Sequence, residues 1–266
     1  MTITLEEFRS RYDIKETTIG GTLWRYRVTG DGAAILLLHG MAGNADIWFQ
    51  QIDALSATRK VVAVTYPRVN TLAALAAGID GVLTAEGVET YTVVGSSLGG
   101  YLAQYLVATE SHRVTAAVFA NTFPPNPVIA KRSKNLVTLA GVLPPSFVRA
   151  FLARNVERML VPAGDGSPLL HRLLMEQFDE PGFKEAFLDR YRCVIYPFEP
   201  TQPSIPVSLI SANNDPLVPQ ELSKVLCETY PDATTYEFDG GGHFPYVNRP
   251  DEYTSILERF LSQAGI

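Results

Sequence analysis

Ser97 is the residue whose surroundings point most directly to chemistry. It lies at the centre of Gly95-Ser96-Ser97-Leu98-Gly99, which follows an apolar, β-branched run and precedes apolar residues at helical spacing. This context is typical of the G-x-S-x-G nucleophile motif, in which the serine stands on a tight turn between a strand and a helix. The glycines leave room for the crossing chains, and the helix N-terminus favours a negatively charged oxygen. The pattern predicts Ser97 as a nucleophile.

A serine hydroxyl is a weak nucleophile without a general base, and His243 is the candidate for that base. It lies in the glycine-rich segment 239–246, between the last predicted strand and the last predicted helix. In a sheet of this type the catalytic residues follow the chain order Ser, acid, His, and His243 alone among the four histidines satisfies that order. The other histidines are His39, His112 and His171.

Asp215 is the predicted acid that would orient the imidazole and stabilise its protonated form. It follows the predicted strand 207–211, in the loop where the acid is expected, and the chain then restarts a helix. The place after the preceding strand holds Asn121 and Thr122, neither of which ionises. Two further acids, Asp239 and Asp251, are so close to His243 in sequence that surface or capping roles are favoured for them.

An oxyanion needs two backbone N–H donors aimed at the developing charge. Leu98, directly after the nucleophile, is the predicted first donor, and Met41 in the loop after strand 35–39 is the predicted second. The neighbouring His39 and Gly40 are expected to border the substrate, because glycine lets this loop approach a carbonyl. Trp48, just past the loop, is either an aromatic substrate surface or a core residue. The site requires no metal and no cofactor.

Composition fits one enzyme-sized unit of 266 residues with 46 % hydrophobic and 19 % charged residues. The net charge of −6 and the absence of a basic patch beyond Lys131–Lys134 argue against nucleic acid as a partner. No apolar stretch reaches membrane-spanning length, the N-terminus has no signal pattern, and two cysteines provide neither a disulfide framework nor a metal-ligand spacing. We therefore expect a cytoplasmic protein without stable membrane insertion; the oligomeric state is not predicted.

The elements that must position these residues alternate between strand and helix. Continuous apolar runs predict five buried strands, namely 35–39, 61–65, 91–95, 114–121 and 207–211, with a further strand at 234–238. Helical spacing separates them, and Gly20-Gly21 joins two segments of an antiparallel hairpin. This alternation predicts an α/β fold with a doubly wound, mostly parallel sheet and an antiparallel edge.

One segment departs from that rhythm. Residues 124–203 contain four predicted helices, near 131–141, 146–160, 168–179 and 182–195, and no convincing buried strand. An insertion of this length is typical of a lid or a binding element, and it leaves from the strand edge where ligands bind in α/β sheets. We expect residues 124–203 to be a helical lid over a core of residues 1–123 and 204–266; a purely structural helical subdomain is the alternative.

Together these motifs resemble the α/β-hydrolase superfamily over nearly the whole chain. They are His39-Gly40-Met41, Gly95–Gly99, Asn214–Pro219, Gly242–Tyr246 and Arg249–Tyr253. The resemblance implies the α/β-hydrolase fold with an inserted lid and a Ser-His-Asp triad. The nucleophile position holds serine and not aspartate, which argues against the epoxide-hydrolase and haloalkane-dehalogenase branches.

A narrower resemblance is to maspardin and its bacterial relatives. It is carried by segments 50–55, 61–67, 95–104 and 120–123, and by the stretch from 230–233 through 244–246. Maspardin departs from the hydrolase pattern at the His-Gly loop and at the histidine position, and it is discussed as an interaction protein. This chain retains His39-Gly40 and His243, which favours catalysis.

The favoured interpretation is a carboxylesterase-type serine hydrolase that forms an acyl-enzyme, with an uncharged, apolar small-molecule ester as substrate. The alternative is a maspardin-like binding protein with a vestigial triad. Carbon–carbon hydrolysis, thioester cleavage and perhydrolysis use the same triad and stay open. The physiological substrate, its chain length and any movement of the lid are not predicted.

Overall fold

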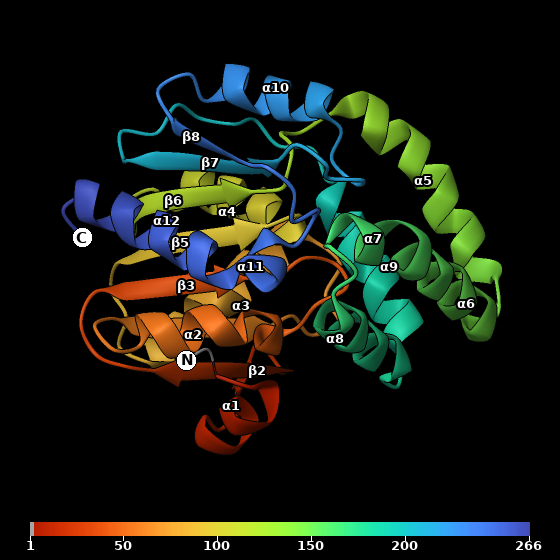
Figure 1. Ribbon diagram of the computed structural model, residues 1–266, viewed down its shortest axis with the longest axis horizontal. Helices are drawn as coiled ribbons and strands as arrows, with labels where there is room; N and C mark the ends of the chain where they lie inside the picture. The colour runs from red at the N-terminus through yellow and green to blue at the C-terminus, as the bar shows by residue number, and fades with distance from the viewer. Residues whose placement is uncertain (1–2) are drawn as a thin grey trace.

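A single twisted sheet organises the computed structural model, which describes residues 3–266 and leaves residues 1 and 2 outside (Figure 1). Within that range the sheet has eight strands in the order β1-β2-β4-β3-β5-β6-β7-β8. Their bounds are β1 Lys15–Ile19, β2 Thr22–Thr29, β3 Ala34–Leu38, β4 Lys60–Thr65, β5 Tyr91–Ser96, β6 Val114–Ala120, β7 Val207–Ala212 and β8 Thr234–Phe238. β1 and β2 are antiparallel to their neighbours and the remaining pairs are parallel, which confirms the predicted sheet with its antiparallel edge.

Helices cover both faces of the sheet because its parallel strands are apolar on both sides. One face packs against α1 (Leu5–Arg11), the 3-10 turn η1 (Ala45–Trp48), α2 (Phe49–Leu55), α11 (Pro245–Asn248) and α12 (Pro250–Gln263). The other packs against α3 (Leu72–Ala85), α4 (Leu98–Thr109) and α10 (Gln220–Thr229). The buried apolar residues accordingly divide into one core on each side of the sheet.

The predicted strands and the structure agree to within a residue or two at each end. Helix α1 was not predicted, because its seven residues are too few to display helical periodicity. Its start nevertheless has a sequence signal. Thr4 accepts a hydrogen bond from the Glu7 backbone while the Glu7 carboxylate accepts one from the Thr4 backbone, which is a capping box.

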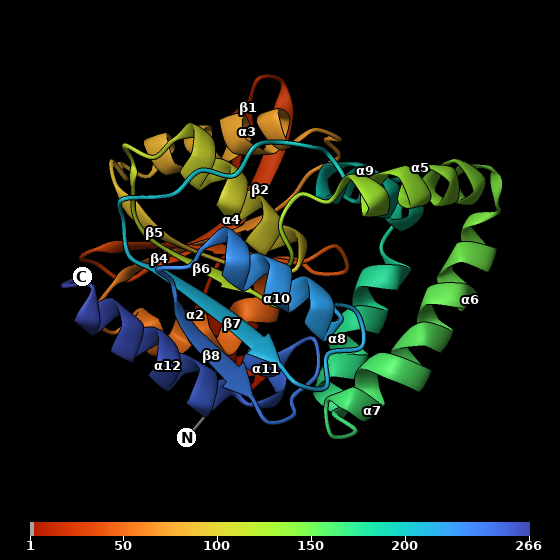
Figure 2. The same ribbon diagram turned by 90° about the horizontal axis from the view of Figure 1, so that it is seen from above.

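Five helices and one π-helical turn intervene between β6 and β7, and we call residues 124–203 the helical insertion. The elements are α5 (Pro127–Val142), α6 (Pro145–Asn155), the π-helical turn η2 (Val156–Leu160), α7 (Val161–Ala163), α8 (Pro168–Asp179) and α9 (Phe183–Val194). The first helix begins at Pro127, earlier than predicted, because Asn126 caps it by accepting from the Val128 and Ile129 backbones. Figure 2 shows the insertion beyond the carboxyl ends of β7 and β8.

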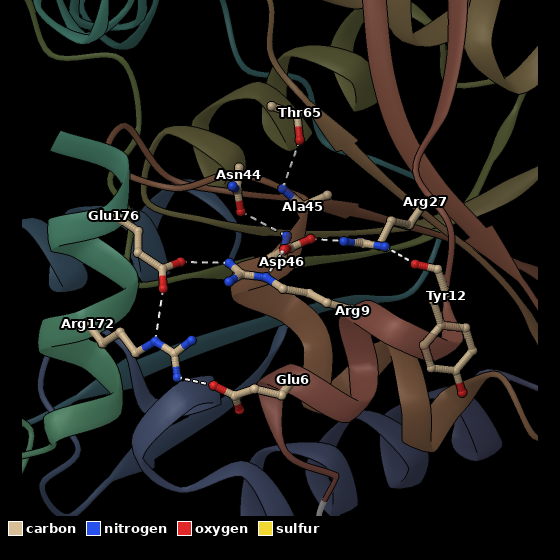
Figure 3. A network of polar contacts seen from close by, with 10 residues as sticks. All are labelled: Glu6, Arg9, Tyr12, Arg27, Asn44, Ala45, Asp46, Thr65, Arg172 and Glu176. Carbon is tan, nitrogen blue, oxygen red and sulfur yellow. Dashed lines mark hydrogen bonds and ion pairs between the residues drawn. The ribbon is translucent and has the colours of Figure 1, made fainter. Parts of the chain in front are cut away.

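Part of the insertion is tied to the core by ionic contacts (Figure 3). Arg9 of α1 bridges Asp46 of η1, at 2.8 Å, and Glu176 of α8, at 2.7 Å. Asp46 also pairs with Arg27 of β2 at 2.7 Å, and both of these side chains are buried. Arg172 of α8 contacts Glu6. These pairs hold α8 beside α1 and η1, next to the loop that follows β3.

Candidate active site

Ser97 stands on the tight turn between β5 and α4 that its motif predicts. Its backbone has φ 57° and ψ −120°, a conformation that L-residues adopt only under strain. The motif requires glycine at both flanking positions because a side chain would collide with neighbouring backbone there. A Cβ at Gly95 would lie 2.1 Å from the Gly99 oxygen, and one at Gly99 would lie 2.0 Å from the Leu38 oxygen. β5, α4 and β3 therefore approach one another as closely as glycine allows.

Asp215 and His243 come together at the same edge of the sheet. The distances from His243 Nδ1 are 2.8 Å to Asp215 Oδ2 and 3.0 Å to Oδ1. Both side chains are almost fully buried, with exposed fractions of 2 % and 3 %. The predicted acid and the predicted base thus form a buried pair, in which Nδ1–H would donate to the carboxylate.

The surroundings of Asp215 keep it ionised. Its Oδ1 accepts from the backbone N–H groups of Leu217 and Val218 at 2.8 and 3.1 Å, and its Oδ2 accepts from Asn121 Nδ2 at 2.9 Å. Burial alone would raise the pKa of this carboxyl, but His243 and these donors outweigh burial and lower it below its ordinary value. The carboxylate is therefore negative at neutral pH and faces the imidazole.

Asn121 is a residue of the candidate site to which the sequence reasoning assigned no role. It follows β6 with φ 45°, and its amide donates to Asp215 as well as to the Gly242 carbonyl at 3.4 Å. Because β6 lies between β5 and β7, Asn121 stands between the nucleophile turn and the acid loop. Its neighbour Thr122 donates to the Ser97 carbonyl at 2.8 Å. Asn121 and Thr122 therefore connect the two halves of the predicted triad.

The Ser97 hydroxyl itself is not bonded to the imidazole. In the described part of the chain, the hydrogen bonds of His243 use Nδ1, and none joins Ser97 Oγ to the ring. Hydrogen bonds between catalytic groups are often long without substrate and tighten in the complex. The structure thus joins Asp215 to His243 directly and links Ser97 to them through Asn121 and Thr122.

The loop after β3 is ordered by the ring of His39. His39 Nδ1 lies 2.6 Å from the Gly40 carbonyl, and the Tyr66 backbone N–H donates to His39 Nε2 at 3.2 Å. The ring is fully buried, and burial together with the nearby Arg190 charge lowers its pKa well below the ordinary value. Neutral His39 therefore donates from Nδ1 and accepts at Nε2.

This arrangement orients the peptide that carries the Met41 N–H. The Gly40 carbonyl also accepts from the Gly43 N–H at 3.3 Å, so two donors fix its direction. In a planar trans peptide the next N–H points the opposite way, which turns the Met41 N–H away from His39. A Cβ on Gly40 would lie 3.2 Å from Ser97 Cβ. The loop therefore approaches Ser97, the predicted nucleophile, at Gly40.

Leu98 is the first residue of α4, so its N–H has no acceptor within the helix. The predicted substrate residues lie deeper than expected. His39 and Trp48 are both fully buried, and Trp48 stacks on Tyr246 with ring centroids 4.0 Å apart. The environment of Trp48 matches the core role that the sequence left open. A substrate contact for either residue stays a prediction.

Two other features bear on the site. Among residues 3–266, no group of three or more His, Cys, Asp or Glu is placed to hold a metal ion. No helix in that range is long and apolar enough to cross a membrane.

Comparison with known proteins decides the family. The model of the alpha/beta hydrolase family matches residues 35–256, most of the chain. The chain belongs to this family. The match begins in β3 and ends in α12, so it includes the elements that carry Ser97, Asp215 and His243.

Named relatives of similar length support a hydrolase. A protein of Azorhizobium caulinodans named as a carbamate hydrolase, RutD, is 28 % identical over 269 residues, covering 90 % of this chain and 94 % of the relative. The pimeloyl-[acyl-carrier protein] methyl ester esterase of Vibrio atlanticus is 27 % identical, covering 90 % and 98 %. The enol-lactonase from Burkholderia xenovorans has the same fold, with a TM-score of 0.79, 17 % identity and coverage of 93 % and 100 %. Family and relatives together indicate an enzyme of the hydrolase type.

Proposed function

We propose that this protein is a serine esterase that hydrolyses uncharged carboxylic esters through an acyl-enzyme. The observation that carries the proposal is the buried Asp215–His243 pair at the strand edge where Ser97 occupies its strained turn. Two relatives are named as a carbamate hydrolase and a methyl ester esterase, and both names describe hydrolysis at an acyl carbon. The alternative function, suggested by the narrower resemblance to maspardin, is that of a binding protein without catalysis.

In the proposed reaction, His243 Nε2 takes the Ser97 proton as Oγ attacks the ester carbonyl. Asp215 holds the imidazole through Nδ1 and stabilises its positive charge. The tetrahedral intermediate expels the alcohol, which receives the proton from His243, and the acyl group stays on Ser97. Water then attacks the acyl carbon with His243 as base, and the acid product leaves.

The N–H groups of Met41 and Leu98 are the proposed oxyanion hole. The fixed direction of the Gly40–Met41 peptide and the free N–H at the start of α4 support this assignment. Fixed donors stabilise a developing oxyanion without reorganising during the step, and losing one typically costs roughly 100- to 1000-fold in kcat.

The helical insertion is the proposed lid and acyl-binding element. A groove of about 280 Å³ lies between α5, α6 and α9, and its lining is almost wholly apolar: Leu136, Val137, Leu139, Ala140, Leu143, Phe147, Val148, Phe151, Leu152, Phe187, Leu188 and Tyr191. Burying an unpaired charge in such surroundings is costly, so we expect uncharged acyl groups. Each methylene that the groove buries should raise kcat/KM about fourfold.

Ser97→Ala tests the proposal. A purified enzyme is incubated with a fluorophosphonate and, separately, with p-nitrophenyl esters of increasing acyl length. We expect the wild type to be labelled at Ser97, and Ser97→Ala to lose the label and on the order of a millionfold in turnover. The neighbouring Ser96→Ala is the control and should keep both.

A wild-type protein that is folded, unlabelled and inactive on every ester would contradict the proposal and favour the binding protein. Parallel assays with thioesters separate the ester reaction from thioester chemistry by the same nucleophile.

A further inference from the structure

Arg190 of α9 reaches from the helical insertion into the loop that carries Met41. Its Nη1 donates to the Met41 carbonyl at 2.8 Å and to the Gly43 carbonyl at 3.0 Å, and its Nη2 donates to the Tyr66 carbonyl at 3.2 Å. The side chain is buried, with 7 % of the residue exposed. One guanidinium thus holds two separate backbone segments, the loop after β3 and the segment after β4.

The contacts of Arg190 are unusual for a buried cation. No carboxylate lies within ion-pair distance of it in the described chain, and the adjacent Asp189 pairs with Arg68 and Arg192 instead. Burial lowers its pKa to about 10, so the group stays charged at neutral pH. A buried charge without a counter-ion costs stability. The planar fork of donors on arginine suits several carbonyls in a fixed arrangement better than the rotatable ammonium of lysine does.

Arg190 holds two carbonyls of this loop, and a third is held from within the loop. His39 and the Gly43 N–H fix the Gly40 carbonyl, and Arg190 fixes those of Met41 and Gly43. Each of these peptides is planar, so fixing its carbonyl also fixes its N–H. The peptides on both sides of Met41 therefore have defined directions, and the second of them depends on α9.

We propose that Arg190 is a positioning residue for the oxyanion hole, which couples the placement of helix α9 to stabilisation of the transition state. This inference rests on the proposed function, because it assumes that the Met41 N–H receives an oxyanion. It assigns α9 two tasks: Phe187, Leu188 and Tyr191 line the apolar groove, and Arg190 holds the catalytic loop. An acyl chain that shifts α9 would then change kcat as well as KM.

The test uses Arg190→Met and Arg190→Lys, with Arg192→Met as the matched control on the same helix. Arg192 is half exposed and pairs with Asp189, so its loss leaves the loop contacts intact. We expect Arg190→Met to lower kcat roughly 10- to 100-fold, less than deletion of an oxyanion donor, with little change in KM. Arg190→Lys should recover part of the loss, since lysine keeps the charge but not the fork.

The decisive readout compares each ester with its thionoester, in which sulfur replaces the carbonyl oxygen. Sulfur is a poor acceptor, so the thionoester gains little from the oxyanion hole. In the wild type and Arg192→Met the oxygen ester should react much faster. In the Arg190 variants this preference should shrink by about the factor lost in kcat. A general structural defect would slow both substrates equally.

The outcomes are distinct. If kcat and the oxygen-to-sulfur preference are unchanged in Arg190→Met, or if both substrates slow equally, the positioning role is wrong. If Arg190→Met does not fold, Arg190→Lys gives the same comparison. If the wild type shows neither ester hydrolysis nor labelling of Ser97, the proposed function fails, and this separates that failure from a failure of the inference.

Discussion

The two ends of the helical insertion differ in what holds them. α8 and α9 are fastened to the catalytic core by polar contacts: Arg9 with Glu176, Arg172 with Glu6, and Arg190 with three backbone carbonyls. α5 and α6, which we call the arm, protrude beyond them (Figure 2). Polar contacts of the arm with the rest of the described chain run to α8 and α9, through Arg149 with Asp179 and Lys184 with two carbonyls.

The two ends also differ in their exposed surfaces. The arm carries large apolar side chains in solvent, including Val142 at 80 %, Phe147 at 61 % and Phe151 at 59 % exposure. On α8 and α9 the comparable residues are buried: Leu170, Leu173, Leu174, Phe178 and Leu188. The comparison teaches that one insertion contains two kinds of helix. α8 and α9 extend the core that carries the candidate site, whereas the arm contacts little besides them, and its proposed role is substrate binding.

Asp215→Asn should have the largest effect and tests the core, with its predicted triad, to which α8 and α9 are fastened. An amide at this position can hold the wrong tautomer of His243, so kcat should fall about ten-thousandfold with the fold intact. Steady-state kinetics and circular dichroism measure the two properties. Asp239→Asn, in the loop before His243, is the control and should stay active; if activity is lost there instead, the acid has been assigned to the wrong loop.

Arg27→Met tests the ionic support beneath α8. It leaves the buried Asp46 carboxylate with Arg9 as its remaining partner. Removing one partner of a buried pair should lower the free energy of unfolding by about 3 kcal/mol, measured by urea denaturation. The double variant Arg27→Met/Asp46→Leu should recover part of this loss, because no charge is left unpaired. If the free energy of unfolding falls no further than it does in a variant of the arm, the proposed difference in anchoring between the arm and α8 and α9 is wrong.

His39→Gln tests the loop that Arg190 holds. His39 is neutral in the folded protein because its pKa is lowered by burial, whereas in the unfolded chain it takes up a proton near pH 6.5. Its contribution is therefore complete above pH 6.5 and is lost as pH falls toward the folded pKa. Across that window the wild type should lose up to about 1.4 kcal/mol of unfolding free energy per pH unit more than His39→Gln.

Urea denaturation at a series of pH values from 8 to 5 measures this difference. At pH 8 His39 is neutral in both the folded and the unfolded state. The difference in unfolding free energy between the wild type and the variant at this pH is therefore the reference for the series. Parallel pH dependences in the wild type and the variant would mean that His39 is not buried as a neutral group.

Phe147→Ser and Phe151→Ser should have the smallest effect on stability and sharpen the role of the arm. Both side chains are exposed, so the free energy of unfolding should change by less than about 0.5 kcal/mol. Both line the apolar groove, so the advantage of octanoyl over acetyl esters should shrink by roughly fourfold for each methylene that loses its contact. Val142→Ser, exposed but outside the groove, should keep the wild-type profile. If all three variants show the same dependence of activity on acyl length, the arm does not bind the acyl group.

Most of the framework was predictable because it depends on local patterns. Each buried parallel strand is a continuous apolar run, and the nucleophile turn has two glycines that no other residue could replace. The pairing of Asp215 with His243 follows from their loops at neighbouring strand ends. Their catalytic roles remain predictions for the experiments above.

The residues that sequence reasoning missed acquire their roles only through tertiary contacts. Asn121 is an uncharged residue after a strand, and it contacts Asp215 because the neighbouring strand β7 ends beside it. Arg190 lies on α9, where the charged residues Lys184 and Asp189 are buried as well, and its own contacts are to loops 149 and 124 positions away in sequence. Arg27 occupies a strand of alternating burial next to an antiparallel edge. Periodicity carries no signal for such contacts.

The π-helical turn η2 joins the arm to the fastened part of the insertion within one continuous helix, from Pro145 to Ala163. A turn of this kind holds one residue more than the α-helical path around it. Deleting one residue there would therefore close the turn into a regular α-helix and leave α6 and α7 in nearly the same relative orientation. The same side chains of α6 would still face the groove, and α8, α9 and Arg190 would keep their places. A length change of one codon is thus tolerated at this turn, whereas the same deletion within α6 would rotate the residues before it by about 100° about the helix axis.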